Sequence, residues 1–122
     1  MNIRNKVLLI GHLGQDPENK TTPNGHEVVR FSLATRESYK NRDGEQVEQT
    51  EWHRCVAWGH RAEFARKYLR KGKEIALEGK LRHRSYDDKD GIRRYVTEVE
   101  VQEMTMVGKK TPSSREVGAD PA

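Results

Sequence analysis

The sequence of 122 residues contains one cysteine, Cys55, and this scarcity excludes a fold held together by intrachain disulfide bonds. A lone cysteine also suits a reducing compartment. No apolar run approaches the roughly 18 residues of a membrane-spanning helix, and residues 1–6 lack the apolar segment of a secretory signal peptide. We therefore expect a soluble, cytoplasmic protein without membrane contact.

Hydrophobic residues are also few, at 33% of the chain, and aromatic residues make up only 7%. So little apolar material cannot build a large compact core, which favours one small barrel or sandwich that shares surface with copies of itself. Charged residues are abundant instead, at 34%, with a formal net charge of +4 and a pI of about 9.3. This balance favours an anionic partner, although the positive excess is modest.

The hydrophobic pattern predicts five strands and one helix. Residues 5–13 form a short apolar run, residues 28–35 alternate apolar and polar positions, and residues 61–70 place small and apolar residues at helical spacing. Three strands, a helix and two strands is the element order of an OB-fold. The predicted fold is therefore all-β, a five-stranded Greek-key barrel with one short helix between strands 3 and 4. The other predicted strands cover residues 50–58, 74–86 and 93–107.

The segments between these elements carry turn signals. Residues 15–27 show no alternation and predict a loop, while Asp43 and Gly44 predict the tip of a long projecting hairpin. The OB-fold domain should comprise residues 1–108. Residues 109–122 contain Pro, Ser and Gly without any period, and we expect them to form a disordered tail.

Some strand positions carry more detailed expectations. Gly11, inside the first apolar run, predicts a bulge or a close approach of another backbone. Leu81 and Tyr95 fall in phase with core positions, so both side chains are expected to point inward. The alternation slips at Gln102, which predicts a β-bulge where the last strand bends.

The stretch EWHRCVAWG carries both tryptophans of the chain in a strand-like run. Because side chains of a strand alternate between its faces, Trp52, Arg54 and Trp58 share one face. His53 and Cys55 lie on the opposite face. The tryptophans could both be core residues, but a core would normally hide indoles without placing an arginine between them. The pattern favours a surface on which flat, anionic groups stack, as nucleobases on a phosphate backbone do.

Further aromatic and basic residues extend this candidate site. The strand over residues 74–86 becomes basic and then aromatic on its outward face, and the polar hairpin carries a tyrosine beside two basic residues. Each base stacked on an aromatic ring contributes ~1–3 kcal/mol without distinguishing one base from another, whereas duplex DNA hides its base faces. The predicted ligand is therefore single-stranded nucleic acid, bound by Tyr39, Lys40, Arg42, Trp52, Arg54, Trp58, Arg82, Arg84 and Tyr86.

The histidines and the cysteine invite two other hypotheses, a metal site and a small enzyme that uses His53 and Cys55. These two residues share a strand face, but no second pair occurs at zinc-ligand spacing. The acidic loop over residues 87–91 lacks the ligand pattern of a Ca²⁺ site. The sequence contains no nucleophile motif and no phosphate-binding glycine loop. We predict no catalytic residue, no metal and no cofactor.

Over about residues 3–108 the sequence closely resembles the bacterial single-stranded DNA-binding protein family. The resemblance implies an OB-fold, usually a homotetramer, that coats exposed single strands during DNA replication, recombination and repair. It keeps both the order and the spacing of several motifs, which are NKV at residues 5–7, GHLGQDPE at 11–18, PNG at 23–25, LAT at 33–35, QTEWHR at 49–54, YLRKG at 68–72 and EGKLR at 78–82.

The resemblance also assigns roles to individual residues. The stacking aromatics of the family correspond to Tyr39, Trp52, Trp58 and Tyr86, so every stacking position keeps a ring. Several members carry tryptophan at the first and last of these positions and phenylalanine at the third. The family's histidine after the central tryptophan corresponds to His53, which the resemblance places near a subunit contact rather than under the DNA.

The resemblance does not extend to the recruitment of partners. Family members typically end in a long linker and an acidic tip with a terminal hydrophobic pair that recruits other genome-maintenance proteins, whereas this sequence ends in GADPA. An accessory, plasmid-type or mobile-element member of the family would account for this ending. The alternative hypothesis is a primosomal-type OB accessory protein, whose sheet face mostly serves protein contacts and binds single strands weakly.

Overall fold

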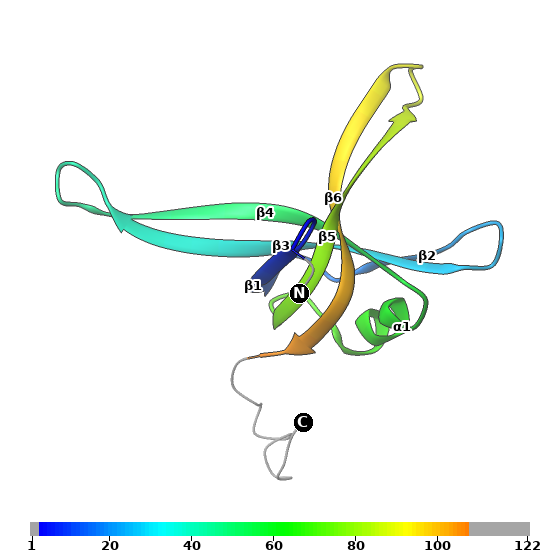
Figure 1. The fold of residues 1–122 in the computed structure, drawn as a ribbon, viewed down its shortest axis with the longest axis horizontal. Helices are drawn as coiled ribbons and strands as arrows, with labels where there is room; N and C mark the ends of the chain where they lie inside the picture. The colour runs from blue at the N-terminus through cyan, green and yellow to red at the C-terminus, as the bar shows by residue number, and fades with distance from the viewer. Residues whose placement is uncertain (1–2, 108–122) are drawn as a thin grey trace, which may run out of the picture.

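The computed structural model describes residues 3–107, and the tail predicted over residues 109–122 lies outside them. The described part consists of strands and one helix, with two long β-hairpins that project from a small centre (Figure 1). In chain order the elements are β1 (Val7–Leu13), β2 (Glu18–Thr21), β3 (Glu27–Lys40), β4 (Gln46–Trp58), α1 (Gly59–Tyr68), β5 (Glu74–Asp87) and β6 (Arg93–Met106).

Five of the strands close into a barrel, in the order β1-β5-β6-β4-β3. The β4–β6 pair is parallel, and β1 closes the ring because its last residues, His12 and Leu13, pair with β3. Gly11 permits this closure, since a Cβ at that position would collide with the carbonyl group of Ala34. The helix lies between β4 and β5, so the predicted OB-fold is confirmed, and so is the close backbone approach at Gly11.

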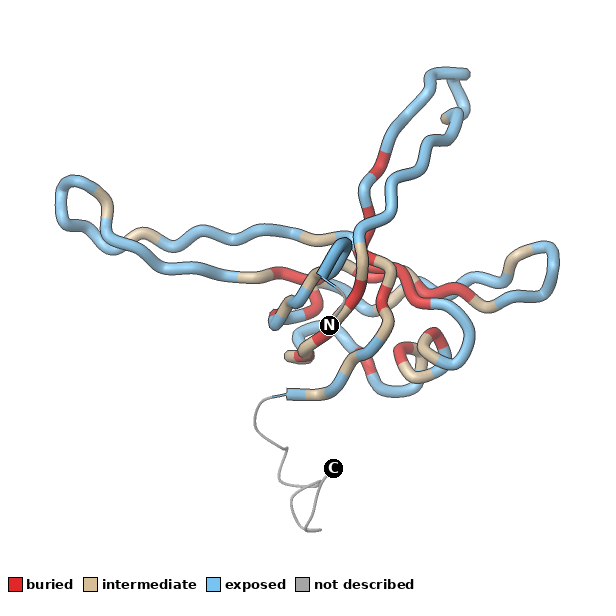
Figure 2. Tube along the Cα trace, viewed as in Figure 1, coloured by how far each residue is buried: buried red, intermediate tan, exposed pale blue. Residues whose placement is uncertain are grey.

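The core lies on one face of the barrel strands. Alternate residues of β3 and β4 point inward and are completely covered, as Leu33 and Cys55 are, while the ribbon is exposed along both projecting hairpins (Figure 2). The helix closes one side of the barrel with Ala62 and Ala65, and Leu69 directly after it joins them; all three are fully buried. The remaining members of the core cluster are Leu13, Val29, Phe31, Ala57, Ile75, Leu77, Val99 and Val101.

Two long hairpins extend beyond the barrel, and we call them the β3–β4 arm and the β5–β6 arm; the shorter β2–β3 hairpin also projects (Figure 1). In the first, the ladder continues without a register shift from Val28 opposite Trp58 to Lys40 opposite Gln46, with the predicted tip between the strands. In the second, the backbone amides of Asp90 and Ile92 donate to the Asp88 carboxylate and organise the tip. The two arms point in different directions (Figure 1).

The structure corrects two expectations about the elements. Residues 15–27 are not all loop, because β2 pairs with the first residues of β3. Every residue of β2 is exposed, so this strand has no buried face to produce an alternating pattern. The helix begins at Gly59 and ends at Tyr68, two residues earlier than predicted at both ends. Gly72 takes a φ of 86° in the turn that follows.

Two side chains expected in the core are exposed instead. Leu81 and Tyr95 have the parity of core residues, but Leu81 lies at the base of the β5–β6 hairpin and Tyr95 lies near its tip. No second layer covers them, and Tyr95 is 80% exposed. The predicted bulge is confirmed, because Glu78 pairs with Glu103 and Gly79 with Val101, which leaves Gln102 unpaired. Within residues 3–107 no helix has the length and apolarity to span a membrane.

Candidate nucleic-acid interface

The strip predicted on β4 is present on the outer face of the sheet. Trp52 is 61% exposed and Trp58 is 39% exposed, and Arg54 between them is exposed as well. Val56 has the same parity but is buried, so the strip is interrupted by one covered aliphatic side chain. Both indoles therefore offer ring surface to solvent, which a pair of core tryptophans would not do.

The indole of Trp52 rests against the backbone at the end of β1. A Cβ at Gly14 would collide with the outer edge of the six-membered ring, so the ring can lie there only because residue 14 is glycine. Across the ladder, Trp52 pairs with Ala34, whose small side chain leaves the inner edge of the ring uncrowded. The backbone at Gly14 thus supports one side of the Trp52 ring, and the rest of the ring is open to solvent.

Arg54 lies opposite Ser32 on the ladder, beside a surface groove of about 390 Å³. No ion pair between Arg54 and any residue in the range 3–107 is present. The groove also borders Arg30, Arg84 and Glu98. A guanidinium without a carboxylate partner beside two exposed indoles is available for a phosphate.

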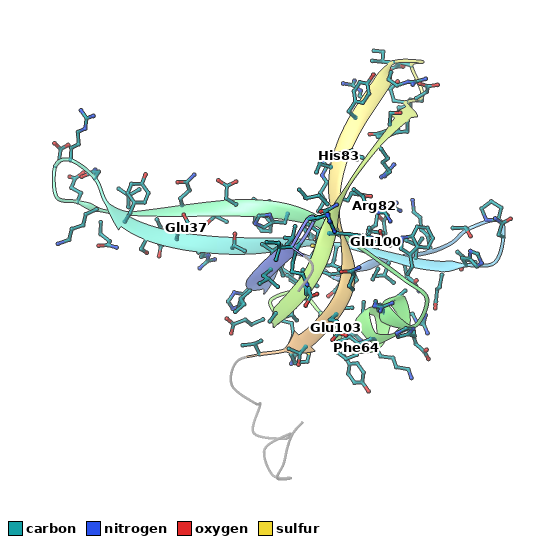
Figure 3. The ribbon with its side chains drawn as sticks, in the orientation of Figure 1. Glu37, Phe64, Arg82, His83, Glu100 and Glu103 are labelled. Atoms are coloured by element: carbon teal, nitrogen blue, oxygen red, sulfur yellow. The ribbon has the colours of Figure 1, made fainter. Side chains whose placement is uncertain are left out.

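Arg84 and Tyr86 extend the site along β5, where Arg84 Cζ lies 5.5 Å from the centroid of the Tyr86 ring. This cation–π contact covers one face of the ring and leaves the other to solvent. Arg82 lies two residues before Arg84 on the same face of β5, closer to the barrel. Its Nε donates a hydrogen bond to Glu100 Oε1 at 2.5 Å. Figure 3 shows Arg82 and Glu100 together where the β5–β6 arm leaves the barrel.

Sequence reasoning missed two acidic residues and one arginine on this face. Glu98 accepts hydrogen bonds from Arg84 Nε at 3.1 Å, Arg84 Nη2 at 3.2 Å and Arg30 Nε at 3.0 Å. Burial alone would raise the pKa of the Glu98 carboxyl, but the hydrogen bonds and charges of Arg84 and Arg30 outweigh burial and lower it. Strand parity places Glu98 and Glu100 on the outward face of β6, but it does not indicate that Glu98 is buried between two arginines.

The basic and aromatic residues of the β3–β4 arm lie apart from the central strip. Tyr39 is exposed near the tip, but the register places it on the same side of the ladder as Leu33 and His53, opposite to Trp52. Lys40 and Arg42, also exposed, follow it at the tip. The structure therefore brings Trp52, Arg54 and Arg84 to one face of the sheet. It leaves Tyr39 near the tip of the β3–β4 arm, apart from them.

The opposite side of β4 holds His53 and Cys55. His53 Nε2 is 2.9 Å from Thr35 Oγ1, and Cys55 is fully buried. Burial, with a smaller contribution from the negative charge of Glu98, raises the pKa of the Cys55 thiol to about 12. No group of three potential metal ligands occurs within residues 3–107. A buried, protonated thiol is unsuited to the nucleophilic role that the enzyme hypothesis requires.

A closed five-stranded barrel with its helix between β4 and β5 defines the chain as an OB-fold protein, and this barrel carries exposed indoles and arginines on one sheet face. Residues 4–107 match the model of the Single-strand binding protein family, and the chain belongs to this family.

Named relatives and a solved structure agree with this membership. The chain is 50% identical over 107 residues to "Single-stranded DNA-binding protein 1" of Chlorobaculum tepidum, covering 87% of this chain and 66% of that one. It is 47% identical over 104 residues to a single-stranded DNA-binding protein of Xanthomonas axonopodis pv. citri, covering 85% and 58%. The chain thus spans less than two thirds of the length of these relatives.

The fold is similar to that of a solved complex described as "Plasmodium falciparum SSB complex with ssDNA". The TM-score is 0.77 at 31% sequence identity, and the match covers 88% of this chain and all of the other. The similarity therefore includes the barrel and extends over nearly the whole described structure.

Proposed function

We propose that this protein binds single-stranded DNA without sequence preference and protects it during DNA replication, recombination and repair. The observation that carries the proposal is the exposed strip of Trp52, Arg54 and Trp58, continued by Tyr86 with Arg84 behind its ring. Membership of the single-strand binding protein family supports it. The proposed role is binding rather than catalysis.

Stacking supplies the part of the binding energy that ignores base identity. Tyr39, Trp52, Trp58 and Tyr86 offer four rings, which together could contribute on the order of 4–12 kcal/mol before the strand's ordering is subtracted. Phosphate contacts add a term that weakens with salt, with a log–log slope of about −0.7 per neutralised phosphate. In this proposal Lys40, Arg42, Arg54, Arg82 and Arg84 supply those contacts.

We also propose that copies of the chain assemble with one another, as a tetramer, through the outer face of β1. Leu8 is 70% exposed and Ile10 is 60% exposed, and both lie on this face. A shallow groove of about 250 Å³ runs beside Leu8, between β1 and the ends of β5 and β6. An exposed aliphatic strand face is typical of a surface that another subunit covers. His53, on the other side of β4, is the proposed residue of a second contact.

Tryptophan fluorescence during titration with a dT oligonucleotide tests the proposed function. Stacking should quench the emission of Trp52 and Trp58, and Trp52→Ala should weaken binding by roughly 5- to 150-fold, the equivalent of about 1–3 kcal/mol for one stacked base. Tyr68→Ala is the matched control, because Tyr68 is an equally exposed ring on α1 that packs on Phe64.

The control should bind like the unmodified protein. Saturation without quenching would contradict the proposed function. Weak binding that moderate salt abolishes would favour the primosomal-type accessory role, in which the sheet face mainly contacts protein. We further propose that the protein works in the cytoplasm, in association with the nucleoid.

A further inference from the structure

We propose that Glu98 is a positioning residue of the DNA-binding face, whose carboxylate holds Arg84 and Arg30 in fixed orientations beside the tryptophan strip. This inference rests on the proposed function and deepens it. Glu98 carries a negative charge, so on its own it would repel the phosphates of bound DNA.

Glu98 stands apart from the other charged residues of the structure. It is 5% exposed, and among residues 3–107 it is the one charged residue classed with the buried positions. Its two carboxylate oxygens together accept from three guanidinium nitrogens, two of Arg84 on β5 and one of Arg30 on β3. One carboxylate on β6 therefore joins the outer ends of two strands that are not neighbours in the sheet.

The geometry leaves both arginines able to contact DNA while they are held. A guanidinium has five N–H donors, of which Arg84 uses two toward Glu98 and Arg30 uses one. Both side chains remain partly exposed. Arg30, Arg54 and Arg84 all line one groove, which Asp16 and Glu18 line as well. A phosphate that bound beside the arginines would meet guanidiniums whose orientation Glu98 already sets.

The contact with Arg84 reaches one step further, to a stacking ring. Arg84 lies over Tyr86, so Glu98, Arg84 and Tyr86 form a chain from the buried carboxylate to an exposed aromatic surface. An arginine side chain that is already ordered loses less conformational entropy when it binds. This gain opposes the repulsion between Glu98 and a phosphate, and the cluster of Glu98 with two arginines keeps a net charge of +1.

Glu100 provides a matched comparison two residues away on the same face. It is more exposed than Glu98 and holds only one arginine, the exposed Arg82. Removing its charge takes away the same repulsion without releasing two oriented guanidiniums. Glu98→Gln and Glu100→Gln therefore separate the positioning effect from the general effect of one negative charge.

The experiment measures dT oligonucleotide affinity of the full chain at several salt concentrations for the unmodified protein, E98Q and E100Q. We expect E100Q to bind more tightly at low salt and to show a steeper salt dependence. We expect E98Q to bind about five- to tenfold more weakly than the unmodified protein, and to keep this loss at high salt, where charge effects are screened.

Binding of E98Q as tight as that of the unmodified protein or of E100Q would overturn the inference. If E98Q does not fold, as thermal unfolding would show, Arg84→Lys decides, since it keeps the charge but cannot form the two-nitrogen contact. R84K should lose affinity without a change of net charge, and unchanged affinity would overturn the inference. Failure of the unmodified protein to bind dT would instead contradict the proposed function itself.

Discussion

At the scale of single residues, strand parity decides which chemistry each side chain of β4 can perform. Trp52, Arg54 and Trp58 face solvent, and Cys55 between them is buried. Adjacent positions of one strand therefore have opposite environments. The same parity that exposes the indoles removes the thiol from any substrate.

The burial of Cys55 predicts how its thiol behaves. Because its pKa is raised to about 12, the folded protein keeps the thiol protonated at pH 8, and Ellman's reagent should not react with it until denaturant is added. The same shift makes the free energy of unfolding depend on pH. The stabilisation that comes from the protonated thiol is fully present below its unfolded pKa of about 8.5, and it is lost as pH rises towards the folded pKa.

Cys55→Ala should remove that part of the alkaline loss of stability, measured as the free energy of unfolding between about pH 8.5 and pH 11. A fast reaction of the folded protein with the reagent at pH 8 would contradict the assignment and revive the hypothesis of a reactive cysteine.

The exposed residues of the site could be predicted from sequence because two tryptophans and an arginine in alternation leave few interpretations. Glu98 could not be recognised in the same way. Its role depends on Arg84 from the neighbouring strand of the hairpin and on Arg30 from a strand 68 residues away, and one of three glutamates in a strand is usually a solvated side chain. Pairing of β6 with β4 and β5 is the information that the sequence lacked.

At the scale of elements, the two arms are the features that distinguish this barrel. Each is a two-stranded ribbon with both faces exposed over most of its length, so neither has a core of its own (Figure 2). The alternation that marks core positions continues along the ribbon beyond the core. For this reason it wrongly predicts a buried side chain at Tyr95. Sequence alternation reports the phase of a strand but not where its covering layer stops.

The β5–β6 arm yields a prediction about its two sides. Tyr86 and Tyr95 lie on opposite sides of the ladder, at neighbouring rungs, and only Tyr86 is backed by an arginine. Tyr86→Ala should weaken dT binding by roughly 5- to 150-fold, the value of one stacked base, whereas Tyr95→Ala should change affinity little. Fluorescence titration measures both variants. Equal losses would show that the strand contacts both sides of the arm.

Element boundaries were predicted less well than element types. The predicted helix starts two residues late because a glycine after a strand indicates a break, whereas Gly59 adopts a φ of 62° and begins the helix. The strand β2 was missed because its side chains are all polar or exposed and its pairing depends on β3 alone. In both cases the deciding contacts lie outside the local sequence.

At the scale of the whole molecule, the order of elements was sufficient to predict the barrel, since short apolar strands around one helix allow few topologies. In the single chain, no other element of the described structure covers the outer face of β1. Its coverage by another copy was suggested by low overall hydrophobicity, and the structure places the exposed aliphatic residues on one strand face.

Assembly through this face predicts the effect of charge there. Leu8→Glu combined with Ile10→Glu should shift the mass measured by light scattering from that of an oligomer to that of a smaller species, because two carboxylates would be buried between subunits. Ile92→Glu is the control, since Ile92 is an exposed aliphatic residue at the tip of the β5–β6 arm. A monomeric unmodified protein would contradict the proposed assembly.

Because the two arms diverge, we expect binding to depend on the length of the DNA strand. Both arms start from the same barrel and point in different directions (Figure 1). In the proposed complex with single-stranded DNA, a short oligonucleotide reaches one arm or the central strip, and only a longer one follows both by turning across the barrel. The number of protein copies per strand should then change in steps rather than smoothly as the strand grows.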